Sequence, residues 1–262
     1  MAKVQELSFS ISAENLNNLI ITLRDLSGID EKSIFKFDPK NTLIYSKVGE
    51  GNSINAFKSF IYNTHELFNI EDFEETINFI SSDTKEMFRK LQILSSFESE
   101  VTGKIYYDKL GDDYYTEKIT MKSDSKLKLN FIGGDPLSLN SKISADIVKR
   151  TMNVEDSNFS FDLKVDDFKN IKRLASNDAE SDIFYLNNTK KDDKFFVSIG
   201  ESGWDLVVSE VEYETNITLS FPKKYFKSIT MNGDSSKIYV FDNKLMISNG
   251  NSDMLISTEL SV

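Results

Sequence analysis

One order of patterns recurs along the chain and constrains its fold more than any other feature. A short segment that alternates apolar and polar residues, as half-buried strands do, leads into an amphipathic helix and then into three more strand-like segments. In the clearest copy, Phe159, Phe161 and Leu163 alternate with polar residues. Asp166 and Asp167 follow and favour a helix start. The order occurs four times, which predicts an α+β chain with helices on one face of antiparallel sheets.

The helices are predicted from apolar residues at three- and four-residue spacing, which form one buried stripe. They are expected at residues 13–26, 84–95 and 166–176, with a fourth that has Pro222 in its first turn and is ended by Gly233. Strands are expected at residues 3–10, 33–38, 42–48, 54–62, 76–80, 100–107, 114–122, 126–132, 159–165, 182–187, 194–199, 204–213, 215–220, 237–242, 245–248 and 254–260. The acidic residues 63–75 fit the pattern poorly and are expected to form a loop with one helical turn.

A Gly-, Pro- and Ser-rich stretch at residues 133–144 divides the repeats into two pairs. We therefore predict two similar domains, each with two strand–helix–three-strand copies. The N-terminal domain is expected at residues 1–135, a connector at 136–144 and the C-terminal domain at 145–262.

Basic residues gather on the predicted outer faces of the helices. They are Arg24, Lys85, Arg89, Lys90, Lys169, Lys172, Arg173, Lys223, Lys224 and Lys227. Because the chain carries a net charge of −11, attraction to a polyanion requires such a local patch. A charged face on a short helix is commonly just solvated. Its repetition here favours the other interpretation, a surface that neutralises phosphates without reading bases.

The residue types argue against an enzyme. The chain has no cysteine, and His65 is its one histidine, which removes thiolate nucleophiles, Cys-ligated zinc and His-rich metal sites. The acidic pairs at 112–113, 166–167 and 192–193 lie at predicted turns or a helix start, where solvation and capping explain them. No GxxxxGK[ST] phosphate loop occurs. We predict no catalytic residue, no metal and no cofactor.

No apolar run matches a signal peptide or a membrane span. Together with the lack of cysteine, this predicts a cytoplasmic protein.

Three segments carry a resemblance to a known family. They read INFISSDTKEMFRKL, SFDLKVDDFKNIKRLAS and ITLSFPKKYFKSITMNGDSSKIYVFDNKLMISNG. In their order of strands and helices they resemble the sliding clamps of DNA polymerases of the PCNA type, and look most like those of tailed bacteriophages. The resemblance implies a homotrimeric ring whose helices line a hole for duplex DNA, with the ten basic residues facing the DNA. It also implies that the ring is a processivity factor, which tethers the replicative polymerase in the cytoplasm of the host cell.

The same resemblance implies two further contact sites. Polymerase and clamp loader would insert short hydrophobic peptides into a pocket near the connector, for which the candidates are Leu137, Leu139, Leu260 and Val262. These leucines could equally pin the connector to the core. The subunits would meet by pairing of edge strands 126–132 and 204–213, with Lys126, Leu127, Leu129, Phe131, Trp204, Leu206 and Val208 at the contact. Trp204 could also be an ordinary core aromatic residue.

Two departures from the family remain in the first domain: a first helix with one basic residue, and residues 65–75, expected as an insertion on the rim.

The alternative function is a non-enzymatic, β-rich structural or interaction protein of a virion, which would have no reason to repeat basic residues on helix faces.

Overall fold

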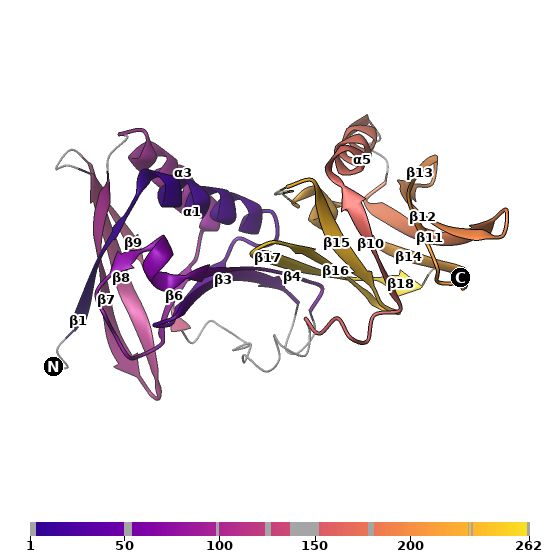
Figure 1. Cartoon of the computed structure of the whole chain (residues 1–262). Helices are drawn as coiled ribbons and strands as arrows, with labels where there is room; N and C mark the ends of the chain where they lie inside the picture. The colour runs from indigo at the N-terminus through magenta and orange to yellow at the C-terminus, as the bar shows by residue number, and fades with distance from the viewer. Residues whose placement is uncertain are drawn as a thin grey trace. The chain divides into compact units, whose positions relative to one another are not determined.

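The computed structural model describes residues 4–49, 54–97, 100–123, 127–136, 152–177, 181–229, 231 and 233–260 (Figure 1). The chain forms two compact units. Unit 1 comprises Met1–Gly51 and Lys58–Ser141, and unit 2 comprises Asn52–Phe57 and Lys142–Val262. The main division therefore falls inside the stretch at 133–144, but the short segment 52–57 joins unit 2, which the sequence pattern did not predict. No helix among the described residues is long and apolar enough to cross a membrane.

Unit 1 is one large, mostly antiparallel sheet with helices on one face. Its elements are β1 (Gln5–Ile11), α1 (Ala13–Leu26), β2 (Ser33–Phe37), β3 (Asn41–Val48), β4 (Ala56–Asn63), α2 (Thr64–Leu67), β5 (Asn69–Ile70), β6 (Ile77–Ser81), α3 (Thr84–Ser95), β7 (Val101–Leu110), β8 (Asp113–Ser123) and β9 (Leu127–Ile132). The strand order is β4-β3-β2-β6-β8-β7-β1-β5, with β9 paired to β8. The pairing of β6 with β8 is parallel.

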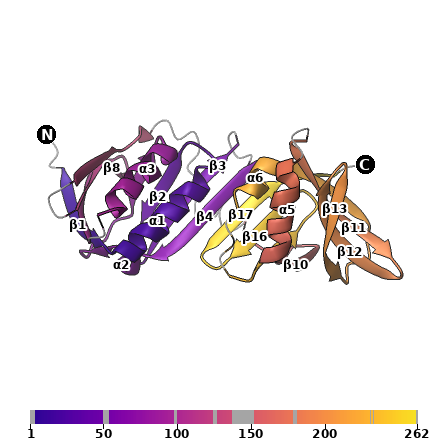
Figure 2. The ribbon, with the colours of Figure 1, turned by 90° about the horizontal axis from the view of Figure 1, so that it is seen from above.

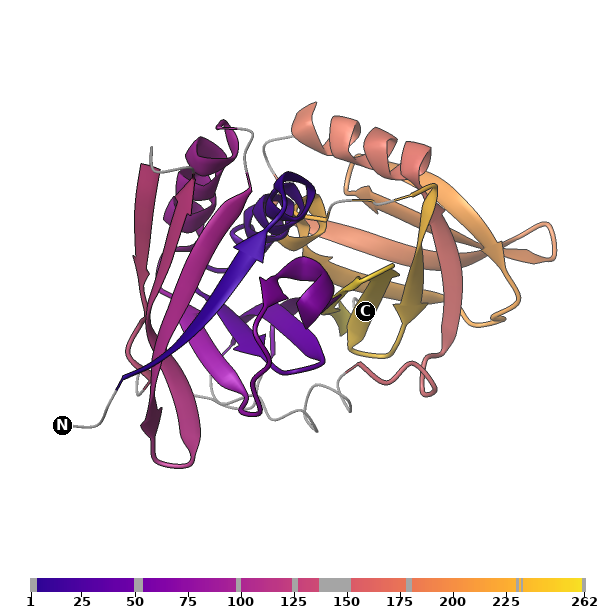
Figure 3. The same cartoon turned by 60° about the vertical axis from the view of Figure 1, so that its left-hand side comes forward.

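Helices α1 and α3 lie side by side on this sheet, as Figures 2 and 3 show. Ser12 caps α1 by accepting from the Asn15 N–H, and Asp83 caps α3 by accepting from the Glu86 N–H. The buried face of α3 consists of Thr84, Met87, Leu91 and Leu94, and that of α1 is mostly leucine and isoleucine. Both helices have the bounds that the apolar spacing predicts.

The acidic segment of unit 1 is not an insertion. Asn63 caps the helical turn α2 by accepting from two backbone N–H groups. Strand β5 then pairs with β1, so that Ile70 lies opposite Phe9. Because Leu67 and Phe68 are also buried in the core, the segment is part of the unit. The helical turn expected within residues 63–75 is present as α2. The expectation of a rim insertion is wrong for residues 65–70, which are packed into the unit.

Unit 2 contains two sheets. Its elements are β10 (Phe159–Lys164), α5 (Val165–Asn177), β11 (Ile183–Lys191), β12 (Lys194–Glu201), β13 (Trp204–Val211), β14 (Ile217–Pro222), α6 (Lys223–Lys227), β15 (Ser235–Val240), β16 (Lys244–Asn249), β17 (Ser252–Ser257) and β18 (Glu259–Leu260). The strand orders are β10-β15-β16-β17 and β13-β12-β11-β14-β18. Rings of Phe184, Phe221 and Phe226 pack together with centroids 5.4–5.9 Å apart and join the second sheet to α6.

The helices of unit 2 differ from expectation in two respects. Helix α6 has only five residues: Pro222 ends β14 and takes the position before the helix instead of lying in its first turn, and the helix ends at Lys227 and not at Gly233. In α5, the apolar spacing puts Phe168, Ile171, Leu174 and Ala175 in one stripe; Phe168, Ile171 and Ala175 are buried, but Leu174 is 39% exposed. The apolar stripe of α5 is thus narrower than its spacing indicates.

Candidate nucleic-acid interface

The outward side of the helix pair in unit 1 carries four of the predicted basic residues. Arg24 on α1 is exposed, as are Lys85 and Arg89 on α3, since the buried stripe of α3 lies on its opposite side. The Lys90 ammonium lies 2.6 Å from Glu86 on the same helix, in a pair exposed to solvent. Such exposed pairs contribute little and break readily, so Lys90 remains available to an anion.

Three of the six predicted basic residues in unit 2 are exposed in the same way: Lys169, Arg173 and Lys224. The Lys169 Nζ lies 3.4 Å from the Asp166 carboxylate in the first turn of α5, again with both side chains exposed. These residues can present charge to a polyanion.

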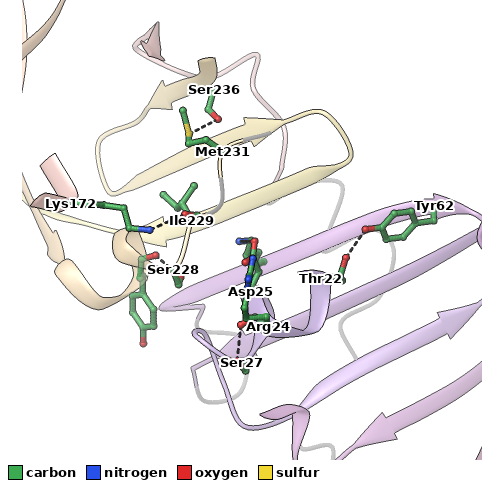
Figure 4. Close-up of polar contacts among 12 residues, drawn as sticks. Thr22, Arg24, Asp25, Ser27, Tyr62, Lys172, Ser228, Ile229, Met231 and Ser236 are labelled. Carbon is green, nitrogen blue, oxygen red and sulfur yellow. Dashed lines mark hydrogen bonds and ion pairs between the residues drawn. The ribbon is translucent and has the colours of Figure 1, made fainter. Parts of the chain in front are cut away.

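Two other lysines of unit 2 bind backbone carbonyls instead. The Lys227 Nζ donates to the Ala175 carbonyl at 3.0 Å, and the Lys172 Nζ donates to the Ile229 carbonyl at 3.4 Å (Figure 4). The last carbonyls of a helix have no partner within it, and a lysine near a helix end commonly satisfies them. Lys227 therefore binds the last turn of α5, and Lys172 binds the segment that follows α6, while both lysines stay half-exposed.

Lys223 is a correction to the predicted DNA-facing set. It is 5% exposed, its Nζ lies 2.5 Å from the buried Glu201 carboxylate at the end of β12, and it also donates to the Ser181 carbonyl. A buried cation needs such partners, because its desolvation otherwise costs several kcal/mol. Lys223 is the first residue of α6 and directly follows β14. Its side chain is buried against Glu201 of the neighbouring sheet and does not lie on an outward helix face.

Unit 1 has its own buried ion pair, which the sequence did not predict. The Lys58 Nζ on β4 lies 2.9 Å from the Asp25 carboxylate on α1, and both side chains are buried. A nearby hydrogen bond of 2.5 Å joins Thr22 to Tyr62, so α1 is fixed to β4 by two polar contacts (Figure 4).

The two strands predicted at the subunit contact are edge strands. Among the described residues, β9 pairs only with β8, and β13 pairs only with β12. Of the predicted contact residues, Phe131 is buried, and Leu127, Leu129, Trp204, Leu206 and Val208 are half-buried. Lys126 lies outside the described residues. The Trp204 ring also packs edge-on against Phe184, with centroids 6.1 Å apart, so it contacts the core of unit 2 from the edge strand.

Of the predicted peptide-pocket residues, Leu260 is 60% exposed on β18, whereas Leu137, Leu139 and Val262 lie outside the described residues. A groove of about 810 Å³ opens beside β18 in unit 2. Its lining includes Asn55, Ile183, Pro222, Tyr225 and Glu259. Leu260, which follows the lining residue Glu259, is the one predicted pocket residue near this groove. Ile183 and Tyr225, which line it, were predicted only as strand and helix residues.

The residues considered for catalysis each have a local structural setting. His65 is exposed on α2, where its backbone N–H donates to Asn63. Asp192 and Asp193 have φ of 50° and 63° in the hairpin turn between β11 and β12. The pair at 166–167 lies in the first turn of α5. Turn and helix-start chemistry therefore explain both acidic pairs.

The chain has the α+β fold of DNA sliding clamps, in its PCNA-like form with two domains and helices packed on sheets, which confirms the predicted fold class. The structure of A. fulgidus PCNA with the bound C-terminal region of FEN-1 is 13% identical to this chain, with a TM-score of 0.62 over 98% of both chains. The beta subunit of Borrelia burgdorferi DNA polymerase III is 15% identical with a TM-score of 0.66, and the match spans 96% of this chain and 64% of that one.

A Helicobacter pylori beta clamp bound to a DNA ligase peptide is 12% identical with a TM-score of 0.60, over 96% of this chain and 66% of that one. Neither a protein-family profile nor a curated protein sequence matches the chain. At these identities the likeness shows the fold alone.

Proposed function

We propose that this chain is the subunit of a sliding clamp, a ring that encircles duplex DNA without reading its sequence and tethers a replicative DNA polymerase as its processivity factor. The observation that carries the proposal is the placement of exposed basic residues on the helices of both units in a chain of net charge −11 with the clamp fold. Lysine and arginine on such a surface neutralise phosphates and release counterions whatever the sequence.

The proposed DNA-facing set is smaller than the sequence indicated. It contains Arg24, Lys85, Arg89, Lys90, Lys169, Arg173 and Lys224. Lys172 and Lys227 stand at its border, since they are half-exposed but already bind carbonyls. Lys223 is excluded by its burial. With so few cations per subunit, direct contact with DNA is weak and sensitive to salt, and a closed ring supplies the retention.

The ring itself is proposed as a homotrimer closed by pairing of β9 in one subunit with β13 in the next, which removes two unpaired edges. The groove beside β18 is proposed to take short peptides of the polymerase and the clamp loader. Ile183, Pro222 and Tyr225 give an aromatic or aliphatic anchor an apolar place to bind, and the rest of the lining is mostly polar and includes Lys224 of the DNA-facing set. A phage-type clamp acting in the host-cell cytoplasm remains the prediction from the sequence pattern.

Two measurements test this function. Sedimentation equilibrium should give three times the subunit mass of 29.9 kDa at micromolar concentration. Binding to a 40-base-pair duplex, followed by fluorescence anisotropy, should be independent of sequence. It should fall by about 100-fold when Lys85, Arg89, Arg173 and Lys224 are all changed to Glu. Unchanged binding by that variant, with its circular-dichroism spectrum intact, would mean that the helix faces do not contact DNA.

A further inference from the structure

The outer face of unit 1, opposite its helices, holds lysines on neighbouring strands. On this face Lys104 of β7, Lys118 and Lys122 of β8 and Lys128 of β9 alternate with Thr102, Thr120 and Asn130. Lys104 has a partner, because its Nζ lies 2.8 Å from Glu6. Lys118 lies over the Tyr106 ring, 4.6 Å from its centroid.

Lys122 and Lys128 differ from these two. They are directly opposite each other in the β8–β9 ladder, both are exposed, and neither makes an ion pair within the described ranges of the chain. Like charges at directly opposed positions of an antiparallel pair destabilise it. Since β9 is the edge strand, a carboxylate supplied from outside that edge would relieve this repulsion.

Strand β13 carries carboxylates along its own edge. A bulge leaves Val208 without a partner in the β12–β13 ladder, where Val207 lies opposite Ser198 and Glu210 lies opposite Phe196. Asp205, Val207 and Glu210 are therefore successive outward positions of β13, and Glu212 follows the end of the strand at Val211. Glu210 pairs with Lys194 at 2.9 Å, whereas Glu212 is exposed and has no ion pair among the residues described for unit 2.

Each edge strand also has an exposed β-branched side chain on this outward face. Ile132 at the end of β9 is 67% exposed, and Val207 in β13 is 57% exposed. An edge with such side chains and free backbone groups is a template for pairing with another chain.

We propose that β13 of a second copy of this chain docks antiparallel on β9 with Val207 opposite Ile132, Glu210 opposite Asn130 and Glu212 opposite Lys128. The inference rests on the proposed ring and adds its register and its ionic contact. The Asn130 side chain accepts from Thr120, which leaves its amide N–H groups to donate to Glu210. Glu212 would neutralise Lys128 and so reduce the repulsion between Lys128 and Lys122, which lies opposite it.

The other registers match this chemistry less well. A shift of two residues places Ile132 opposite Asp205 and Asn130 opposite Val207, which sets an apolar side chain against a carboxylate. A parallel arrangement that keeps Ile132 opposite Val207 places Lys128 beside the turn at Gly203, with no carboxylate there. Antiparallel pairing in the proposed register is the arrangement that matches both the apolar and the charged positions.

Ring closure should consequently weaken with salt. The ion pair at Lys128 is on the outer face and partly solvated, so screening reduces its attraction, while the Ile132–Val207 contact and the backbone ladder persist. Salt would thus set how often the ring opens.

Cysteine cross-linking tests the register, because the chain has no cysteine of its own. The double variant Ile132→Cys, Val207→Cys should give covalent trimers on mild oxidation, whereas the matched control Asn130→Cys, Val207→Cys should give at least about tenfold less. Preferential cross-linking of the control would overturn the register. A sedimenting trimer in which neither variant cross-links would overturn docking on β9 but leave the ring. A monomer at every salt and protein concentration would overturn the ring itself.

A charge exchange tests the ionic contact. Lys128→Glu and Glu212→Lys should each raise the trimer dissociation constant by about tenfold at low salt, and the two changes together should restore it to within about twofold. Lys104→Gln, two strands from β9, is the control and should leave the constant unchanged. A combined variant no better than the weaker single one would refute the contact between Lys128 and Glu212.

Discussion

The two helix pairs of this molecule carry the same pattern of basic residues and use it differently. In unit 1, α1 and α3 have 14 and 12 residues, satisfy their own backbone and leave Arg24, Lys85 and Arg89 exposed. In unit 2, α6 has five residues. There Lys172 and Lys227 bind carbonyls, and Lys223 is buried against Glu201. In unit 2, three lysines of α5 and α6 thus bind groups of the protein itself, whereas the basic residues of α1 and α3 in unit 1 stay at the surface.

The largest difference in unfolding free energy is expected between a variant of Lys223 and a variant of its neighbour Lys224. Lys223→Met leaves Glu201 buried without a counter-charge and should lower the free energy of unfolding by about 3 kcal/mol. Lys224→Met, on an exposed position one residue later, should change it by less than about 0.5 kcal/mol. Urea unfolding followed by circular dichroism measures both. Equal effects would mean that the buried pair does not distinguish the two lysines.

The next largest loss of unfolding free energy is expected from changes at Lys172 and Lys227. Changing both to Met removes two charged donors from backbone carbonyls and should cost about 2 kcal/mol of unfolding free energy. The control is Lys169→Met, whose ion pair with Asp166 is exposed and should contribute less than about 0.5 kcal/mol. If the control proved as costly as the double variant, the carbonyl contacts would not be what joins α5 to α6.

The exposed residues of the two units should contribute equally to DNA binding. Lys85→Ala with Arg89→Ala in unit 1, and Arg173→Ala with Lys224→Ala in unit 2, should each lower the salt slope of duplex binding by about two, one per cation removed. Neither pair should alter stability appreciably. The slopes come from anisotropy titrations across a series of NaCl concentrations. A change confined to one unit would assign the DNA contact to that unit alone.

The smallest effect concerns an exposed pair in unit 1. The hydrogen bond to Glu6 raises the pKa of Lys104, followed by the charge attraction of the same carboxylate. A raised pKa means that the pair supports folding below the unfolded pKa of lysine and loses that support as pH rises through the folded pKa. Glu6→Gln should lower the pKa of Lys104, measured by NMR titration of its side chain. An unshifted titration would show that Glu6 is not its partner in solution.

The sequence predicted the elements well where local spacing decides them. Helices α1 and α3 have the predicted bounds, because a long amphipathic stripe and a capping residue are local signals. The sequence did not predict the burial of a charged residue where that burial depends on a partner far away in the chain. Asp25 is buried because Lys58 meets it, and Lys223 because Glu201 does, and neither partner lies nearby in the chain.

The same limit applies to the candidate site. Periodicity placed every basic residue of a helix on one outward face, but the shortness of α6 and the orphan carbonyl of Ala175 turned some of them toward protein. The helical turn in residues 63–75 was predicted, but the pairing of β5 with β1 was not, because it depends on a distant strand and not on a periodic pattern.

One measurement tests the clamp function most directly. Subunits are diluted until they dissociate, then concentrated in the presence of nicked circular plasmid so that rings close around the DNA without a loader. The sample is washed at a salt concentration at which sedimentation still shows the trimer, divided, and one half is cut once with a restriction enzyme before gel filtration. A clamp should elute with the uncut circle and be released from the cut DNA. Equal retention on both, or on neither when the protein is trimeric, would contradict the account.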